Sequence, residues 1–111
     1  MIKYISVAAD GAMWIWDEPE YAEDHLLGYG LSAGEQAAIH EVELEPANLN
    51  DANVFIVYNE CGLEFVKAPD ERDKEYDDMI EEVYKVKHCY RSWEFKMELT
   101  THVIHRPELP F

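Results

Sequence analysis

Regularly spaced carboxylates are the side chains of this chain best suited to chemistry at a surface. Glu41, Glu43 and Glu45 occupy alternate positions of a predicted strand, so that neighbouring carboxylates stand about 6.7 Å apart. Phosphates of one nucleic-acid strand advance about 3.4 Å along the axis, and the row therefore matches every second phosphate. This spacing favours electrostatic binding to a basic protein surface.

Acids on two predicted helices extend this array. Glu20, Glu23 and Asp24 fall three or four residues apart, on one outer face of the first helix. The segment 70–82 is dense in acids, and its periodicity favours a second helix. The candidate partner-binding acids are Asp17, Glu18, Glu20, Glu23, Asp24, Glu41, Glu43, Glu45, Asp70, Asp73, Asp77 and Asp78, and the candidate aromatic anchors are Trp16, Tyr21 and Tyr29.

The histidines and the acidic run at 70–78 do not have the spacing of a metal site. The run lacks the glycine and the regular pattern of a calcium loop. His102 and His105, three apart on a predicted strand, face opposite sides of it. His25 is expected on a helix surface and His40 at the edge of the core. We therefore predict no metal site.

Nucleophilic chemistry is not favoured either. Cys61 lies in a predicted turn, but no cation stands near it in the sequence to activate its thiol. Cys89 follows His88, and adjacent side chains on a strand face opposite ways. The chain has no Gly-x-Gly-x-x-Gly, no phosphate loop and no Gly-x-Ser-x-Gly. The expectation is a protein with no catalytic residues and no cofactor.

The net charge excludes a conventional nucleic-acid binder. The 111 residues include 24 Asp plus Glu against 9 Lys plus Arg, which gives a formal charge of −15. Duplex DNA is itself an anion, and a protein binds it through Lys and Arg. Residues 4–66 contain no Lys or Arg, whereas Lys85, Lys87, Arg91 and Lys96 lie close together. We expect these four cations to pair with the acidic half of the chain or with the rim of a partner.

Local signals assign the elements that position these residues. A helix is predicted at 18–27, with Asp17 as its cap, Pro19 in its first turn and Gly28 or Gly30 at its end. Strands are predicted at 2–8 and 12–16 around an Asp10-Gly11 turn, at 37–45, 53–58 and 63–67, and from 93 toward 105.

Segment 68–87 allows two interpretations. Apolar and aromatic residues recur there at helical spacings, which predicts an amphipathic helix. Alternation over 83–90 favours a strand instead, and we prefer the helix. The fold class is thus α+β, with a mainly antiparallel sheet of about six strands and two helices in one domain, 1–111.

The chain is expected to be cytoplasmic. Its first residues lack the apolar core of a signal peptide, and its apolar runs are far shorter than the roughly 20 residues that span a bilayer. Two cysteines in a chain with enough apolar residues for a core also fit a reducing compartment. No membrane association is expected, and the protein is expected to be a monomer or a homodimer.

One part of the chain resembles a known family. The segments WIWDEPEYA at 14–22 and IHEVELEP at 39–46 look like the strand, short helix and strand of ADP-ribosyltransferase-like domains. The resemblance covers residues 14–46, about a third of the chain. It implies an enzyme of that type, or a degenerate relative of one.

The charge pattern favours a different function. Its ordered carboxylates resemble, as a class, the small acidic phage and viral proteins that mimic DNA to block restriction or CRISPR nucleases. On this hypothesis the chain is a non-enzymatic inhibitor that occupies the basic, nucleic-acid-binding surface of a partner protein, in the host cytoplasm if the source is viral. The alternatives are the ADP-ribosyltransferase-like enzyme and an acidic cytosolic structural subunit.

Overall fold

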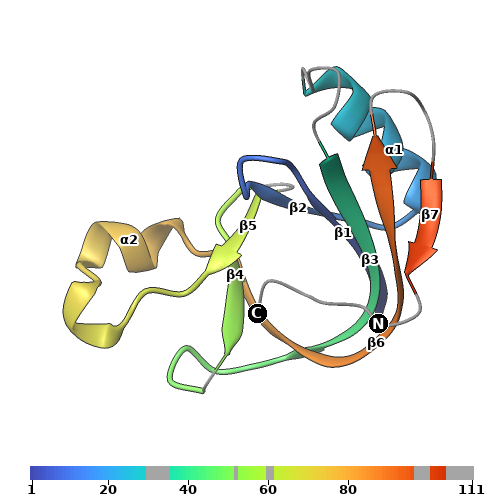
Figure 1. Ribbon diagram of the computed structural model, residues 1–111. Coiled ribbons are helices and arrows are strands. Elements are labelled where there is room, and N and C mark those ends of the chain that lie inside the picture. The colour runs from blue at the N-terminus through green and yellow to red at the C-terminus, as the bar shows by residue number, and fades with distance from the viewer. Residues whose placement is uncertain (30–35, 52, 60–61, 97–100, 105–111) are drawn as a thin grey trace.

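The computed structural model describes residues 1–29, 36–51, 53–59, 62–96 and 101–104. Within these ranges the chain forms seven β-strands, two α-helices and one 3₁₀-helix (Figure 1). In chain order they are β1 (Ile2–Val7), β2 (Met13–Trp16), α1 (Pro19–Gly28), β3 (Gln36–Pro46), β4 (Val54–Val57), β5 (Gly62–Phe65), η1 (Pro69–Glu71, the 3₁₀-helix), α2 (Lys74–Met79), β6 (Glu82–Lys96) and β7 (Thr101–Ile104).

The strands form one antiparallel sheet that closes on itself. Its order is β3-β1-β2-β5-β4-β6-β7, and a further pairing of β3 with β6 completes a barrel. The predicted α+β class with a mainly antiparallel sheet is confirmed in this coarse form. Nothing in the sequence predicts the closure, because it depends on a pairing between strands that are far apart in the chain.

The first hairpin forms as its turn residues predict. β1 pairs antiparallel with β2, and the Ala8 amide donates to the Ala12 carbonyl at 2.9 Å. Gly11 has φ +91°, a left-handed conformation that strains any residue with a Cβ. The Asp10 side chain accepts a hydrogen bond from the Ala12 amide at 3.0 Å and holds the turn closed.

Gly11→Ala is expected to lower the free energy of unfolding by about 1–2 kcal/mol, the cost of the left-handed conformation. A Cβ at Gly11 would meet no atom within 4 Å, so backbone strain is the whole effect. Gly28→Ala is the matched control, because a Cβ there also meets nothing and Gly28 lies in a helix. In this control, alanine should raise the free energy of unfolding by up to about 1 kcal/mol, because it replaces a glycine within a helix. Urea unfolding checks both, and equal losses in the two variants would contradict the prediction.

The predicted helix at 68–87 is wrong for most of its length, and the alternative strand at 83–90 is correct. Only η1 and the six-residue α2 are helical there, and β6 begins at Glu82. β6 pairs with β4 on one side and β3 on the other, which satisfies the backbone groups that a helix would have paired internally. Tertiary pairing of these β-branched and aromatic residues overrides the helical spacing.

Strand β6 is also irregular along its length. Its register with β3 shifts twice, leaving Lys87 and Tyr90 as extra residues without a partner position on β3. Such bulges increase the local twist of a strand, and here they lie where β6 curves to close the barrel. The predicted single strand from 93 toward 105 is wrong as well: β6 ends at Lys96, and β7 pairs antiparallel with residues 92–95.

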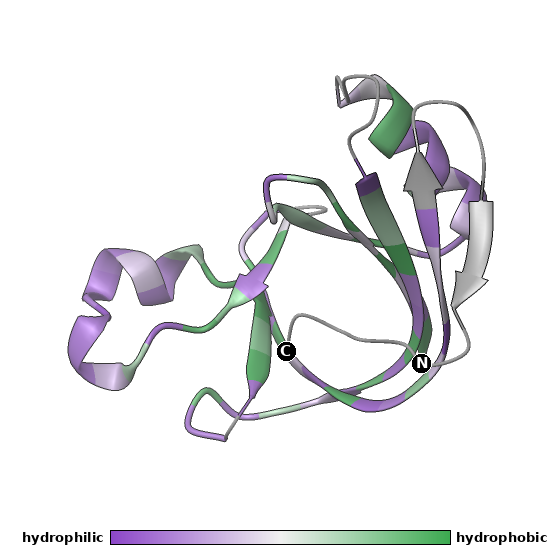
Figure 2. Cartoon of the chain, viewed as in Figure 1, coloured by the Kyte–Doolittle hydropathy of each residue, from purple (hydrophilic) through white to green (hydrophobic). Residues whose placement is uncertain are grey.

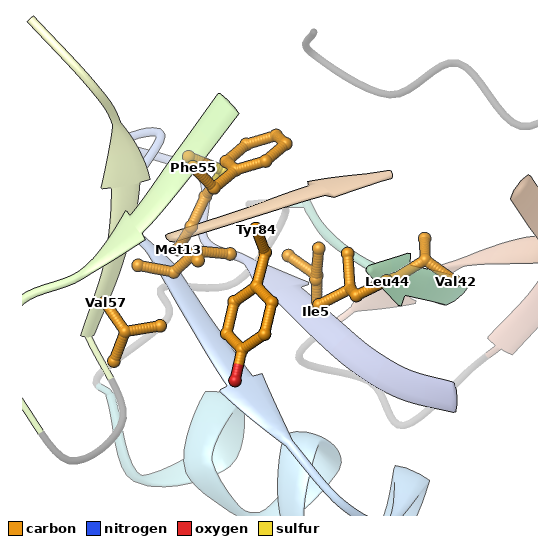
Figure 3. Packing of buried hydrophobic residues seen from close by; sticks show 8 residues of the cluster. Ile5, Met13, Val42, Leu44, Phe55, Val57 and Tyr84 are labelled. Carbon is orange, nitrogen blue, oxygen red and sulfur yellow. The ribbon is translucent and has the colours of Figure 1, made fainter. Parts of the chain in front are cut away.

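Apolar side chains fill both faces of the sheet. The barrel interior contains one cluster, in which the Tyr84 ring lies between Ile5 and Val57 (Figure 3); its buried members are Ile5, Met13, Val42, Leu44, Phe55, Val57, Leu63 and Tyr84. A second cluster lies outside the barrel under α1, with Ala22 and Leu26 of the helix packed against Ala37, Ile39 and Trp93.

Helix α1 begins and ends nearly where predicted, but not by the predicted cap. Its N-cap is Glu18, which makes no side-chain capping bond, and Pro19 occupies the first turn. Asp17 instead pairs with Lys3 of β1. Of the residues expected to face the core, Leu26 is fully buried, whereas the Tyr21 side chain is 56% exposed.

Candidate binding site at the open end of the barrel

A pocket of about 260 Å³ opens at one end of the barrel, between the end of β2 and strands β4 and β6. Only Met13 and Trp14 of β2 pair with β5, so the end of β2 has no paired neighbour on that side within the described residues. The pocket is lined by residues of β1, β2, β4, β6 and the start of α1: Lys3, Ile15, Trp16, Asp17, Tyr21, Val57, Glu82 and Tyr84.

Two of the lining residues form an ion pair. Lys3 is two residues before the buried Ile5, so it points to the inner side of the barrel wall, and its ammonium contacts the Asp17 carboxylate. The Lys3 side chain is 24% exposed and that of Asp17 73% exposed. Because the Asp17 side chain is so exposed, much of its carboxylate stays open to a further partner even though Lys3 contacts it.

Tyr84 and Glu82 form the opposite wall. The Tyr84 hydroxyl donates a hydrogen bond to the Glu82 carboxylate. Burial raises the pKa of Tyr84 to about 12, and the bond to Glu82 and its charge add to this effect. The phenol is therefore neutral at physiological pH, and Glu82 supplies the negative charge on this side.

Two of the three predicted aromatic anchors line the pocket. Trp16 is half-buried, and its indole donates to the Ser6 hydroxyl at 2.9 Å. Tyr21 projects from α1 into solvent. Tyr29 lies elsewhere: its hydroxyl donates to the Asp10 carboxylate at 2.6 Å, which joins the end of α1 to the first hairpin.

The prediction that His25 lies on the helix surface is wrong. Its ring lies 4.3 Å from the Trp14 ring and 4.9 Å from the Trp16 ring, between α1 and the sheet. Burial lowers its pKa, and its Nδ1 has no hydrogen-bond partner among the described residues. His25 therefore helps to pack the helix against the barrel rather than to bind a partner.

The row of glutamates on β3 is neutralised within the molecule. Glu41 lies 3.5 Å from the Arg91 guanidinium, Glu43 lies 3.5 Å from the N-terminal amine, and Glu45 lies 3.3 Å from the Lys85 ammonium. The expected internal pairing is thus confirmed for Lys85 and Arg91. These glutamates do lie on one face, as predicted, but each has a cationic neighbour of its own.

The acids predicted at 70–78 do not share a helix face. Asp73 caps α2 by accepting a bond from the Tyr76 amide at 2.8 Å, and Asp77 lies 3.5 Å from the Arg72 guanidinium. Asp70 and Asp78 are exposed and have no ion pair among the described residues. The whole segment projects from the barrel on the side away from α1, and Figure 2 shows it as predominantly hydrophilic.

The acids of α1 remain without cationic partners. Glu18, Glu20 and Asp24 are exposed and Glu23 is half-buried, and none makes an ion pair within the described ranges. They follow directly on Asp17 at the mouth of the pocket.

The pocket also has a neighbour that sequence reasoning missed. A second hollow of about 580 Å³ shares Glu82 and Tyr84 with it and adds Asp77 and Glu81. Asp17, Asp77, Glu81 and Glu82 thus border two adjoining hollows, and we call them the acidic rim. Glu82 and the buried Tyr84 stand two residues apart, which places them on one face of a strand, and this spacing is the signal that could have identified the rim.

One pair of polar side chains is buried inside the barrel wall. His40 is 3% exposed and Ser92 fully buried, and His40 Nδ1 lies 2.5 Å from the Ser92 hydroxyl oxygen. His40 is thus deeper than the core edge predicted for it, and burial lowers its pKa to about 4. Cys89 Sγ lies 3.7 Å from the same hydroxyl, and burial raises the pKa of its thiol, which keeps it protonated.

In the described part of the chain, no three His, Cys, Asp or Glu residues are grouped as a metal would require, and no helix is long and apolar enough to cross a membrane. Cys61, His105 and the side chain of His102 lie outside what the structure describes.

Comparison with known proteins adds no relative: no family model, curated protein or solved structure matches the chain. Over residues 14–46 the order β2, α1, β3 is the expected strand, helix and strand. The resemblance of that part to ADP-ribosyltransferase-like domains stays a prediction.

Proposed function

We propose that this protein is a non-enzymatic inhibitor that occupies the basic, nucleic-acid-binding surface of a partner protein, as DNA mimics of the anti-restriction or anti-CRISPR type do. The observation that carries the proposal is the shortage of compensating cations. Among the described residues, the acids that lie within ion-pair distance of a cation are Asp17, Glu41, Glu43, Glu45 and Asp77.

The position of the remaining acids supports the same function. Most of them lie on α1 and on the segment 70–82. The acidic rim takes Asp77, Glu81 and Glu82 from this segment and Asp17 from the residues before α1. A surface of this kind attracts a basic protein over several ångströms and orients it before contact. It repels nucleic acid itself, which carries the same sign of charge.

Capture from a lysate of the native host tests the proposal. At low salt the immobilised protein should retain a nucleic-acid-binding protein, and added duplex DNA should release it, because DNA competes for the same basic surface. High salt should release it too. Retention of no such protein, or retention that duplex DNA leaves unchanged, would overturn the proposal.

Charge reversal of one residue locates the binding surface. Asp24→Lys on α1 should weaken binding of the captured partner several-fold at low salt, mainly through the association rate. Asp51→Lys is the matched control, since Asp51 is also exposed and the change in net charge is the same. Equal weakening by both variants would show an effect of net charge alone, and would count against an ordered acidic surface.

A further inference from the structure

We infer that the pocket at the open end of the barrel binds the guanidinium group of an arginine side chain. The inference rests on the proposed function, because it assigns that arginine to the basic surface of the partner. It adds a specific anchor to what is otherwise long-range attraction, which salt screens.

The side chains that line the pocket match the chemistry of a guanidinium. Tyr21 provides an exposed aromatic ring, and Asp17 and Glu82 provide carboxylates. A guanidinium is planar, stacks on aromatic faces and donates up to five N–H bonds in a fixed fork. It can therefore use the Tyr21 ring and the carboxylates at the same time.

Other ligand classes fit less well. The one cation among the lining residues, Lys3, is already held by Asp17, so that an anion would face uncompensated carboxylates. A neutral apolar group would desolvate Asp17 and Glu82 without pairing them. A lysine ammonium is a compact, strongly hydrated charge, and it gains less from flat rings than arginine does.

The size of the pocket suits a single side chain. Its volume of about 260 Å³ lies below the range of about 300–1,000 Å³ that is usual for sites holding a whole small molecule. The exposed Tyr21 stands at its edge, where it can cover the stem of an entering arginine.

Titration with N-acetyl-arginine amide, followed by NMR of the intact protein, tests the inference. Saturable shifts are expected at the backbone amides of Asp17 and Tyr21, which line the pocket, with a Kd in the millimolar range that suits so small a ligand. N-acetyl-lysine amide should bind several-fold more weakly. N-acetyl-citrulline amide, which has the same shape without the charge, should produce no saturable shift.

Three variants identify the groups that bind. Glu82→Gln removes the charge but keeps an acceptor for the Tyr84 hydroxyl, and should weaken arginine binding about tenfold. Tyr21→Ala removes an exposed ring and should weaken it several-fold. Tyr29→Ala, a control at the residue that follows the same helix, lies outside the pocket and should leave the Kd unchanged.

The outcomes separate this inference from the proposed function. Absence of saturable shifts, equal binding of citrulline, or full binding by Glu82→Gln overturns the arginine site, while DNA-sensitive capture of a partner would still stand. Arginine binding that depends on Glu82 and Tyr21 supports the site even if no nucleic-acid-binding protein is captured, in which case only the proposed function fails.

Discussion

Acidification from pH 7 to pH 4 is expected to remove about 3 kcal/mol of folding free energy through His40 alone. Burial lowers the pKa of this imidazole from 6.5 to about 4, so the folded state binds fewer protons than the unfolded state between these values. The contribution of His40 is therefore complete above pH 6.5 and is lost as the pH falls toward 4. The short contact with Ser92 holds the neutral ring in the barrel wall.

Urea unfolding of the wild type and of His40→Gln across this pH range isolates the effect. The variant should be less stable at pH 7, and its stability should fall less steeply toward pH 4. The other ionisable groups, including His25, whose pKa is also lowered, are common to both proteins, and their effects cancel in the difference. Parallel curves for the two proteins would show that His40 does not carry the pH dependence.

Glu41→Ala is expected to cost about 2 kcal/mol, far more than the same change at Glu45. The Glu41 side chain is 19% exposed, accepts a bond from the Tyr4 hydroxyl at 2.8 Å and lies 3.5 Å from Arg91. Removal of the Glu41 carboxylate leaves the Tyr4 hydroxyl without its acceptor. Hydrogen bonds to a charged acceptor contribute about 1.5–3 kcal/mol. That bond is also the main reason why the pKa of Tyr4 is raised.

Glu45→Ala is the matched control on the same strand. Its ion pair with Lys85 has side chains 39% and 44% exposed, and such surface pairs contribute about 0–1 kcal/mol. A double-mutant cycle of Glu41→Ala with Tyr4→Phe should then show a coupling of about 1 kcal/mol. Equal losses at Glu41 and Glu45, with no coupling to Tyr4, would refute this account of the row.

The parts of the fold that could be predicted are those set by neighbouring residues. The Asp10-Gly11 turn, the start of α1 at Pro19 and its end at Gly28 depend on backbone preferences that act within a few positions. Segment 68–87 could not be predicted in this way, because its helical and alternating spacings coexist. The choice is made by pairing with β3 and β4, which are distant in the chain.

The candidate site was predictable only in part, for the same reason. Asp17, Trp16 and Tyr21 adjoin one another in the sequence and do line the pocket. Glu82 and Tyr84 reach it only because β6 lies beside β4 in the barrel. The charges of the β3 row were visible in the sequence, but their neutralisation depends on which residues of β6 lie opposite them.

Strand β6 also determines the order in which the protein can assemble during synthesis. Its partners on β3 run as far as Gln36 opposite Lys96, so full pairing must wait until the residues up to Lys96 have left the ribosome. Contacts between such distant residues slow folding. The same strand brings Lys85 and Arg91 to Glu45 and Glu41, and the nascent β3 therefore repels itself until the closing strand arrives with its cations.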